Sequence, residues 1–205
     1  LGADTIGTDN VCIGYNAGSK LTEGGASEVP DKNVAIGGYA LYNAGGGNRR
    51  NTAVGYAALY AMDTADDTSG LNVAVGFNAG YFMGTAVNNT CLGSYAGTSV
   101  TEAKTSGANN TSVGAYAGNL IQGAAHSNTM LGSYAGNTTT TGIGNTIIGY
   151  NCEAEDATAT NQVVIGNNCN GAADNAVHIG NNTNHIAAPF NSGDGSWSYT
   201  SDRRQ

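Results

Sequence analysis

Cysteine is the residue of this chain whose chemistry depends most on spacing. Cys152 and Cys169 stand 17 residues apart, at equivalent places in two successive sequence repeats. If successive repeats stack as neighbouring strands about 4.8 Å apart, their Cα atoms come within the ~4.4–6.8 Å that a disulfide requires. The alternative is that each thiol is a small buried hydrophobe, because Ala fills the same place in other repeats. The chain has no Cys-x-x-Cys pair and therefore predicts no zinc site.

Histidine and clustered carboxylates raise the question of ion binding. His178 lies in a predicted strand, so three copies around a three-fold axis could bind an ion, and a packed imidazole is the alternative. Two acidic clusters lack EF-hand spacing, which favours solvated loops over a Ca²⁺ site: Asp63, Asp66 and Asp67, and Glu153, Glu155 and Asp156. No carboxylate pair is marked out for glycoside cleavage. We therefore expect no metal, no cofactor and no enzyme activity.

Aromatic residues in the spacers between repeats are the candidates for ligand binding. Tyr side chains can stack on sugars or hydrogen-bond to them, and per-repeat insertions often emerge on a binding face. The candidates that lie beyond the repeated positions are Tyr42, Tyr60, Tyr81 and Phe82.

These residues must be positioned by a phrase that recurs ten times, Asn-Thr-x-Val-Gly-x-x-Ala-Gly. Its repeat glycines are 14 to 23 residues apart, so a constant phrase alternates with spacers of variable length. That pattern is typical of stacked supersecondary units with loops between them. The repeat glycines are Gly14, Gly37, Gly55, Gly76, Gly93, Gly114, Gly132, Gly149, Gly166 and Gly180.

Each repeat predicts one short strand that ends at its glycine. An aliphatic residue stands one place before the glycine and Val or Thr stands three places before it, so the two share a strand face. The residue between them is small in the early repeats, and we expect both faces to be buried. Asn stands four places before the glycine in eight repeats, where it can cap its own turn or form a stacked amide ladder: Asn10, Asn33, Asn51, Asn72, Asn89, Asn110, Asn128 and Asn145.

Composition limits how such repeats can fill a core. The 205-residue chain has few large aliphatic residues, 11% charged residues and a net charge of −8. Either the coils are very narrow and filled by Ala and Gly, or several chains share one core. We favour the shared core and expect an all-β, elongated repeat fold, a parallel β-roll or β-helix within an intertwined homotrimeric fibre. An acidic chain without a basic stripe does not suit nucleic acid, and no apolar run is long enough to cross a bilayer.

Two kinds of repeat resemble known fibrous proteins. Asn-Gln-Val-Val-Ile-Gly-Asn-Asn (161–168) and Asn-Ala-Val-His-Ile-Gly-Asn-Asn (175–182) resemble the head repeat of trimeric autotransporter adhesins of the YadA type. In that family three chains wind a left-handed parallel β-roll around a shared axis. Asn-Thr-Ala-Val-Gly-Tyr-Ala-Ala-Leu (51–59) is more similar to the repeats of bacteriophage tail fibres. The resemblance covers residues 10–184.

The C-terminal residues 195–204 resemble the start of the peptidase S74-type intramolecular chaperone domain of phage tailspikes and fibres. By that resemblance the domain cuts the chain between Ser201 and Asp202, although Gln205 stands where the family usually has Leu. We expect a repetitive β-roll segment over 1–184, a terminal β segment over 185–200 and the start of a truncated chaperone domain over 201–205. Without the body of that domain, we expect no self-cleavage.

The resemblance implies a structural and host-adhesion segment of a viral tail fibre, located in the virion. Such a segment is a homotrimeric rod whose loops make multivalent contacts with a host cell-surface glycan or protein receptor. One alternative is the head of a bacterial trimeric adhesin at the cell surface, and a less favoured one is a polysaccharide-degrading tailspike. The sequence that follows residue 205 would separate the first two, and turnover of a glycan would support the third.

Overall fold

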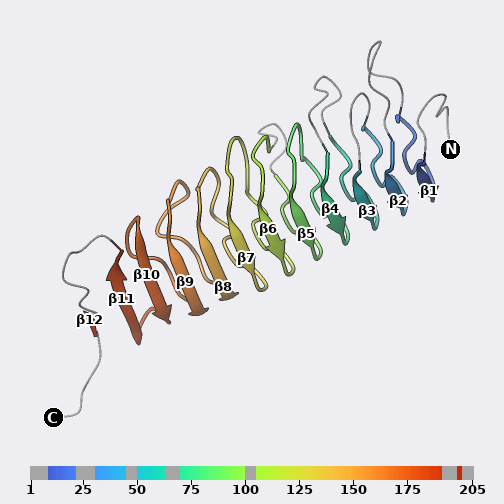
Figure 1. Cartoon of the computed structure of the whole chain (residues 1–205). Helices are drawn as coiled ribbons and strands as arrows, with labels where there is room; N and C mark the ends of the chain where they lie inside the picture. The colour runs from blue at the N-terminus through green and yellow to red at the C-terminus, as the bar shows by residue number, and fades with distance from the viewer. Residues whose placement is uncertain are drawn as a thin grey trace.

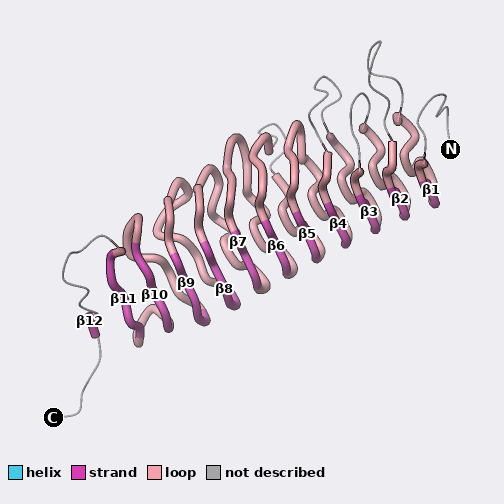
Figure 2. The backbone as a smooth tube through the Cα atoms, in the orientation of Figure 1, coloured by secondary structure: helices cyan, strands magenta, loops and turns pink. Residues whose placement is uncertain are grey.

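The protein is an all-β solenoid built from one sheet. The computed structural model describes residues 9–21, 31–44, 50–62, 70–99, 105–190 and 198–199, which contain no helix and so none that could cross a membrane. The sheet runs in chain order along a row of coils (Figures 1 and 2). Its strands are β1 (Val11–Ile13), β2 (Val34–Ile36), β3 (Thr52–Val54), β4 (Val73–Val75), β5 (Thr90–Leu92), β6 (Thr111–Val113), β7 (Thr129–Leu131), β8 (Thr146–Tyr150), β9 (Val163–Asn167), β10 (Ala176–Gly180), β11 (His185–Pro189) and β12 (Ser198–Tyr199).

The strands pair in the register of the sequence repeat. β1 to β10 are parallel, and equivalent residues of neighbouring repeats face each other, as with Ile36 and Val54 in β2 and β3. β11 and β12 then pair antiparallel with their predecessors. The predicted class, an elongated parallel β-repeat with one strand per repeat, is confirmed. Ser201, Asp202 and the cluster Asp63, Asp66 and Asp67 lie outside the described residues.

Each coil closes around its own narrow core. The middle residue of each strand points inward, where Ala35, Ala53 and Ala74 are fully buried and larger side chains such as Met130 and Ile147 follow. The opposite wall is the alanine column three places after the repeat glycines, for example Ala58 and Ala96. Of the two alternatives for the core, the narrow coil filled by small residues therefore describes the interior of the single chain.

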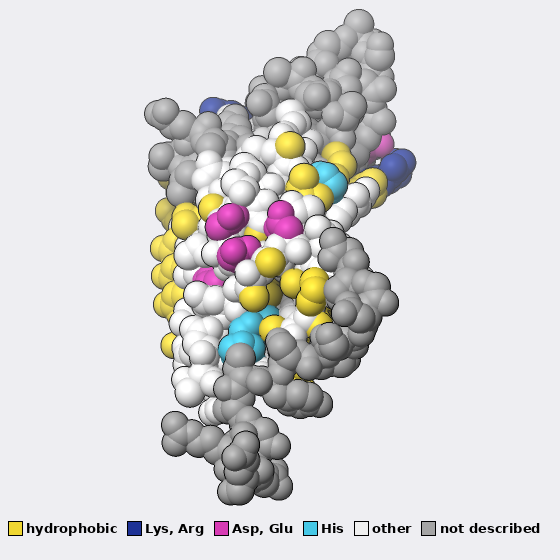
Figure 3. All heavy atoms as spheres, turned by 90° about the vertical axis from the view of Figure 1, so that its left-hand side faces the viewer, with side chains coloured by type: hydrophobic (Ala, Val, Ile, Leu, Met, Phe, Trp, Pro, Cys, Tyr) yellow, Lys and Arg dark blue, Asp and Glu magenta, His cyan; other side chains and the backbone are white. Residues whose placement is uncertain are grey.

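Two columns of aliphatic and Thr side chains lie on the outside of the coil. The expectation that both strand faces are buried is wrong for the single chain, since Ile13 is 59% and Leu131 45% exposed. Side chains of a strand alternate between its two faces, so these columns point away from the interior that holds the middle residue. We call these two columns the outer face. They are Val11, Val34, Thr52, Val73, Thr90, Thr111, Thr129, Thr146, Val163 and Val177, and Ile13, Ile36, Val54, Val75, Leu92, Val113, Leu131, Ile148, Ile165 and Ile179. All are half-buried or exposed except Val177, and hydrophobic side chains follow one edge of the view along the coils (Figure 3).

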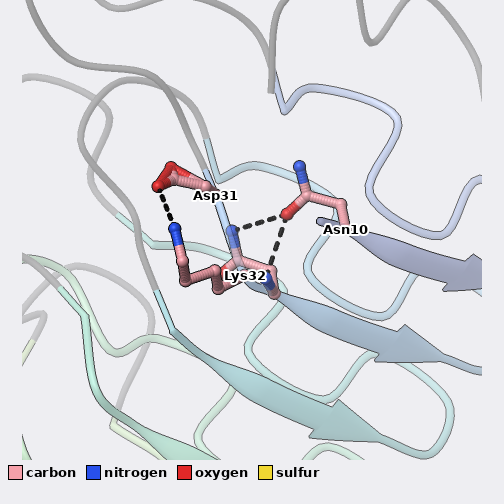
Figure 4. A network of polar contacts seen from close by, with 4 residues as sticks. Asn10, Asp31 and Lys32 are labelled. Atoms are coloured by element: carbon pink, nitrogen blue, oxygen red, sulfur yellow. Dashed lines mark hydrogen bonds and ion pairs between the residues drawn. The ribbon is translucent and has the colours of Figure 1, made fainter. Parts of the chain in front are cut away.

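A buried asparagine ladder fixes the distance between coils. The Oδ1 atom of Asn89 accepts two hydrogen bonds from Asn110, at 2.9 Å from its backbone N and 3.0 Å from its Nδ2. The pattern begins at Asn10 and Asn33, beside the Asp31–Lys32 ion pair (Figure 4), and reaches the backbone N of Gln162. Several Nδ2 groups also donate to a spacer carbonyl, as Asn110 does to Ala125 O at 2.8 Å. The ladder thus ties strands and spacers together.

The repeat glycines stack backbone on backbone. Gly93 has a φ of 131°, and a Cβ there would lie 2.6 Å from the carbonyl oxygen of Gly114 in the next coil. The same contact recurs along the row, so a side chain is excluded both by conformation and by space. Positive φ and lack of space therefore both favour glycine at this position.

Replacing Asn110 by Ala should lower the free energy of unfolding by at least about 2 kcal/mol. The change removes the acceptor of two Asn128 donors and the donor to Ala125 O, all of them buried. Chemical denaturation followed by far-UV circular dichroism measures the loss. The exposed Ser106→Ala is the matched control, and an equal effect in both variants would contradict a stabilising role of the ladder.

Replacing Gly93 by Ala should destabilise the protein more than Gly123→Ala. Gly123 also has a positive φ, 54°, but a Cβ there meets nothing closer than 3.8 Å. Both variants therefore incur the backbone strain of about 1–3 kcal/mol, and only Gly93→Ala adds a clash with the next coil. Thermal melts of the two variants give the comparison; indistinguishable melting temperatures would refute the stacked-glycine contact.

Candidate functional site

Aromatic rings form a continuous ladder along one side of the solenoid. We call it the first ladder, and each member stands one or two places after a repeat glycine. Adjacent ring centroids lie 4.9–6.3 Å apart, because one coil stacks directly on the next. Its members are Tyr15, Tyr39, Tyr56, Phe77, Tyr95, Tyr116, Tyr134 and Tyr150.

A shorter second ladder lies beside it and contains the binding candidates named from the sequence. Tyr42, Tyr60 and Tyr81 each stand five places after a repeat glycine in three successive coils. Their rings stack nearly parallel, with centroids 5.1 Å apart for Tyr42–Tyr60 and 4.6 Å for Tyr60–Tyr81. Phe82 packs edge-on against Tyr81 at 4.5 Å. The structure therefore brings all four candidates together.

A groove of about 370 Å³ is bordered by the two ladders. It is lined by Tyr39, Tyr56, Ala57, Tyr60, Asn78 and Tyr81. The ring of Tyr39 links the ladders, since its centroid lies 5.4 Å from that of Tyr42 and 6.2 Å from that of Tyr60. Ala57 is almost fully buried, whereas Tyr56 is 52% exposed.

Sequence reasoning missed four of the six lining residues. Tyr39 and Tyr56 belong to the repeated positions and were not named as binding candidates, and neither Asn78 nor Ala57 was singled out. The sequence signal that could have found them is the position of Tyr five places after the repeat glycine, which occurs only in the repeats of β2, β3 and β4 and places that ring beside the first ladder. Other coils have Ser19, Thr98, Asn119 and Asn137 at that place. The solenoid therefore does not require an aromatic residue there.

The turns that carry the groove adopt unusual backbone conformations. Tyr39 and Ala57 have positive φ angles of 58° and 51°, and so do Leu41 and Leu59, at 51° and 49°. Five other coils place a glycine where these two leucines stand: Gly18, Gly80, Gly97, Gly118 and Gly136. A bulky residue with positive φ is strained, and such strain clusters at functional sites. Here burial of Leu41 and Leu59 in the core holds the turns in place.

The groove is polar but uncharged. Its lining contains phenol hydroxyls and one amide, and no carboxylate, imidazole, thiol or amine. Burial, and then the neighbouring Tyr60, raises the pKa of Tyr81; burial and Tyr15 raise that of Tyr39. Both hydroxyls are therefore protonated at neutral pH and can donate as well as accept. The buried Oδ1 atom of Asn78 has no hydrogen-bond partner among the described residues.

A single cation lies near one end of the second ladder within the described ranges. The Nζ of Lys20 is 4.8 Å from the ring centroid of Tyr42 and donates to Asn43 Oδ1 at 3.2 Å. It does not line the groove. The groove itself offers aromatic rings and neutral hydrogen-bonding groups, which are suited to binding an uncharged polar ligand.

The cysteine alternatives are now separated. Cys152 and Cys169 form a disulfide between adjacent coils, with their Cα atoms 4.6 Å apart. The alternative of two free thiols is wrong for this pair. Cys91 is a free thiol, and burial raises its pKa to about 12, so it is an unreactive core residue.

The other candidates for ion binding serve turns and packing. Glu153 accepts hydrogen bonds from Asn137 N and from Thr138 N and Oγ1, at 2.8–3.2 Å, and Asp156 caps Thr158. His178 is 5% exposed and stacks on His185, with ring centroids 4.1 Å apart. Among the described residues no three His, Cys, Asp or Glu side chains gather as a metal site would require.

Acid should weaken the C-terminal coils through His178. Burial, and then the nearby His185, lowers the pKa of His178. The imidazole of an unfolded chain titrates at ~6.5. Around and below that pH the unfolded chain therefore binds more protons than the folded one, and the free energy of unfolding decreases as the pH is lowered. We expect thermal melts at about pH 5.5 to fall below those at about pH 7.5, and His178→Val, which matches Val164 of the preceding coil, to reduce that difference. An unchanged difference would refute this assignment.

Comparisons with known proteins return no match to set beside this geometry. No protein-family model matches the chain, and no curated protein and no solved structure does. The function is therefore argued from the groove and the outer face themselves.

Proposed function

We propose that this chain is a structural and host-adhesion segment of a homotrimeric viral tail fibre, in which three solenoids pack through their outer faces. The observation that carries the proposal is the unbroken aliphatic stripe on those faces. Ten strands at about 4.8 Å per strand give it a length of roughly 45 Å, and exposed apolar patches of such extent mark interaction surfaces.

The composition of the outer face favours further copies of the same chain as its partner. Both columns consist only of Val, Ile, Leu and Thr, so they offer nothing to a charged partner. Parallel copies in register place equivalent residues at equal heights along a common axis, and every coil then contributes to the interface. Burial on association supplies the aliphatic core that the single coil lacks.

Adhesion follows from the same arrangement. None of the residues that line the aromatic groove belongs to the outer face. Three parallel copies that pack through their outer faces therefore present three grooves around one rod. Weak contacts made by several tethered sites add to a much higher overall affinity. The proposed role therefore combines reach along the rod with multivalent attachment to a surface receptor of the host.

The head of a bacterial trimeric adhesin is the second candidate. It is favoured by the coils of β9 and β10, whose strands are five residues long and carry the two phrases that resemble YadA-type heads. A chaperone-type domain downstream of residue 205 in the parent gene would favour the viral fibre. A coiled-coil stalk followed by a membrane anchor would favour the adhesin.

Light scattering coupled to size exclusion tests the assembly. We expect a mass near three times the 20.5 kDa of one chain. Leu131→Glu should convert the trimer to monomer without loss of β structure, because the residue is exposed in one chain and association would bury three carboxylates.

The control for Leu131→Glu is Ser106→Glu, which adds the same charge at an exposed site away from the outer face. It should leave the mass unchanged. A wild-type protein that is monomeric at micromolar concentration, or a Leu131→Glu variant that keeps the trimer mass, would overturn the proposal.

A further inference from the structure

We infer that the groove bordered by the two aromatic ladders is a carbohydrate site that binds an uncharged hexopyranose unit of a surface glycan. The inference rests on the proposed adhesive role and assigns that role a location and a ligand class. The four rings of Tyr39, Tyr56, Tyr60 and Tyr81 and the amide of Asn78 carry it.

The rings supply a platform for a sugar ring. A pyranose has a face of C–H groups that packs on an aromatic surface, which is electron-rich over its face. Tyr60 is stacked between Tyr42 and Tyr81, at 5.1 and 4.6 Å, so its two faces are covered within the second ladder, whereas Tyr39 is tilted by 54° relative to Tyr60. The groove thus has one stacked wall and one angled wall, and a compact, rigid pyranose chair fits between them better than a flexible chain.

The polar groups of the groove are complementary to the hydroxyl groups around a pyranose ring. Hydroxyls around a pyranose both donate and accept, and the protonated phenols do the same. Asn78 lines the groove, and its amide adds one more group that can both donate and accept.

Charge and size narrow the ligand further. The lining is uncharged and the chain carries a net charge of −8, which disfavours phosphates, nucleotides and uronates. The volume of about 370 Å³ lies at the small end of ligand pockets, which span ~300–1,000 Å³. One or two sugar units fit that description.

The groove is less suited to binding an extended peptide. Extended peptides gain affinity by pairing with free backbone groups of a sheet edge. Here the nearby backbone groups already pair from coil to coil: Tyr39 N donates to Tyr15 O at 2.8 Å, and Leu59 N donates to Ala79 O at 3.0 Å.

The repeat itself supplies the variants that test the site. Tyr60→Asn installs the residue that the chain carries at the same place in another coil, Asn119, and Tyr81→Thr installs the counterpart of Thr98. Tyr116→Asn is the matched control. It removes a first-ladder ring distant from the groove lining and installs the residue found there as Asn16 and Asn151.

The probe is an array of neutral gluco-, galacto- and manno-configured oligosaccharides, printed beside sialylated and uronate-bearing ones, followed by saturation-transfer NMR on the neutral hits. We expect neutral glycans to bind the wild-type protein, with ring C–H protons receiving the strongest saturation. Tyr60→Asn and Tyr81→Thr should each weaken binding at least tenfold, and Tyr116→Asn should change it less than twofold.

Circular dichroism and light scattering on every variant serve to check that the fold and the mass are unchanged. No neutral binding by folded wild-type protein, binding restricted to acidic glycans, or equal binding by the groove variants would overturn the assignment. These outcomes differ from failure of the fibre proposal. A monomeric protein that still binds neutral glycans through Tyr60 and Tyr81 would contradict the trimer and support the glycan site in the groove. A trimer that binds a host protein receptor and no neutral glycan would support the adhesive role and contradict the glycan site.

Discussion

The coil-to-coil spacing is the constraint on which the other features depend, and the buried asparagine ladder holds it along the row. Each Oδ1 accepts from the backbone and the side chain of the next coil, so no coil can slip by one residue without leaving buried donors unpaired. The same spacing places glycine on glycine and brings first-ladder rings to 4.9–6.3 Å. Ring stacking on this protein is thus a consequence of backbone register.

A narrow interior follows from alanine on both walls, and it determines what the exterior must be. Side chains such as Ile13 and Leu131 point away from it and stand on the outer face. Apolar side chains of the outer face therefore remain on the surface of the single chain. In this way a strand with a small or core-filling middle residue between two aliphatic or Thr neighbours yields both a self-closing coil and an apolar exterior.

The sequence predicted what depends on periodicity and failed where distance across the coil decides. Strand positions, the glycine stack and the asparagine column follow from spacing alone. Burial of Ala53 was predicted, whereas the partial exposure of its neighbour Val54 in the single chain was not, because aliphatic residues on a shared face indicate burial without saying which core buries them. The approach of Tyr39 to Tyr60 depends on turns with positive φ at Tyr39 and Leu59, which residue type does not predict. The disulfide stayed open because alanine is equally suited to its column.

Modularity has a consequence for how such a rod changes length. From β2 to β7 each coil presents the same ladder donors and acceptors to its neighbours, so duplication or loss of one whole repeat there leaves a joint like those already present. The gene can therefore lengthen or shorten the shaft by recombination in steps of about 4.8 Å. Repeats of 14 to 23 residues from glycine to glycine are accommodated in one sheet, so the spacers can vary in length and sequence while the strands keep their register.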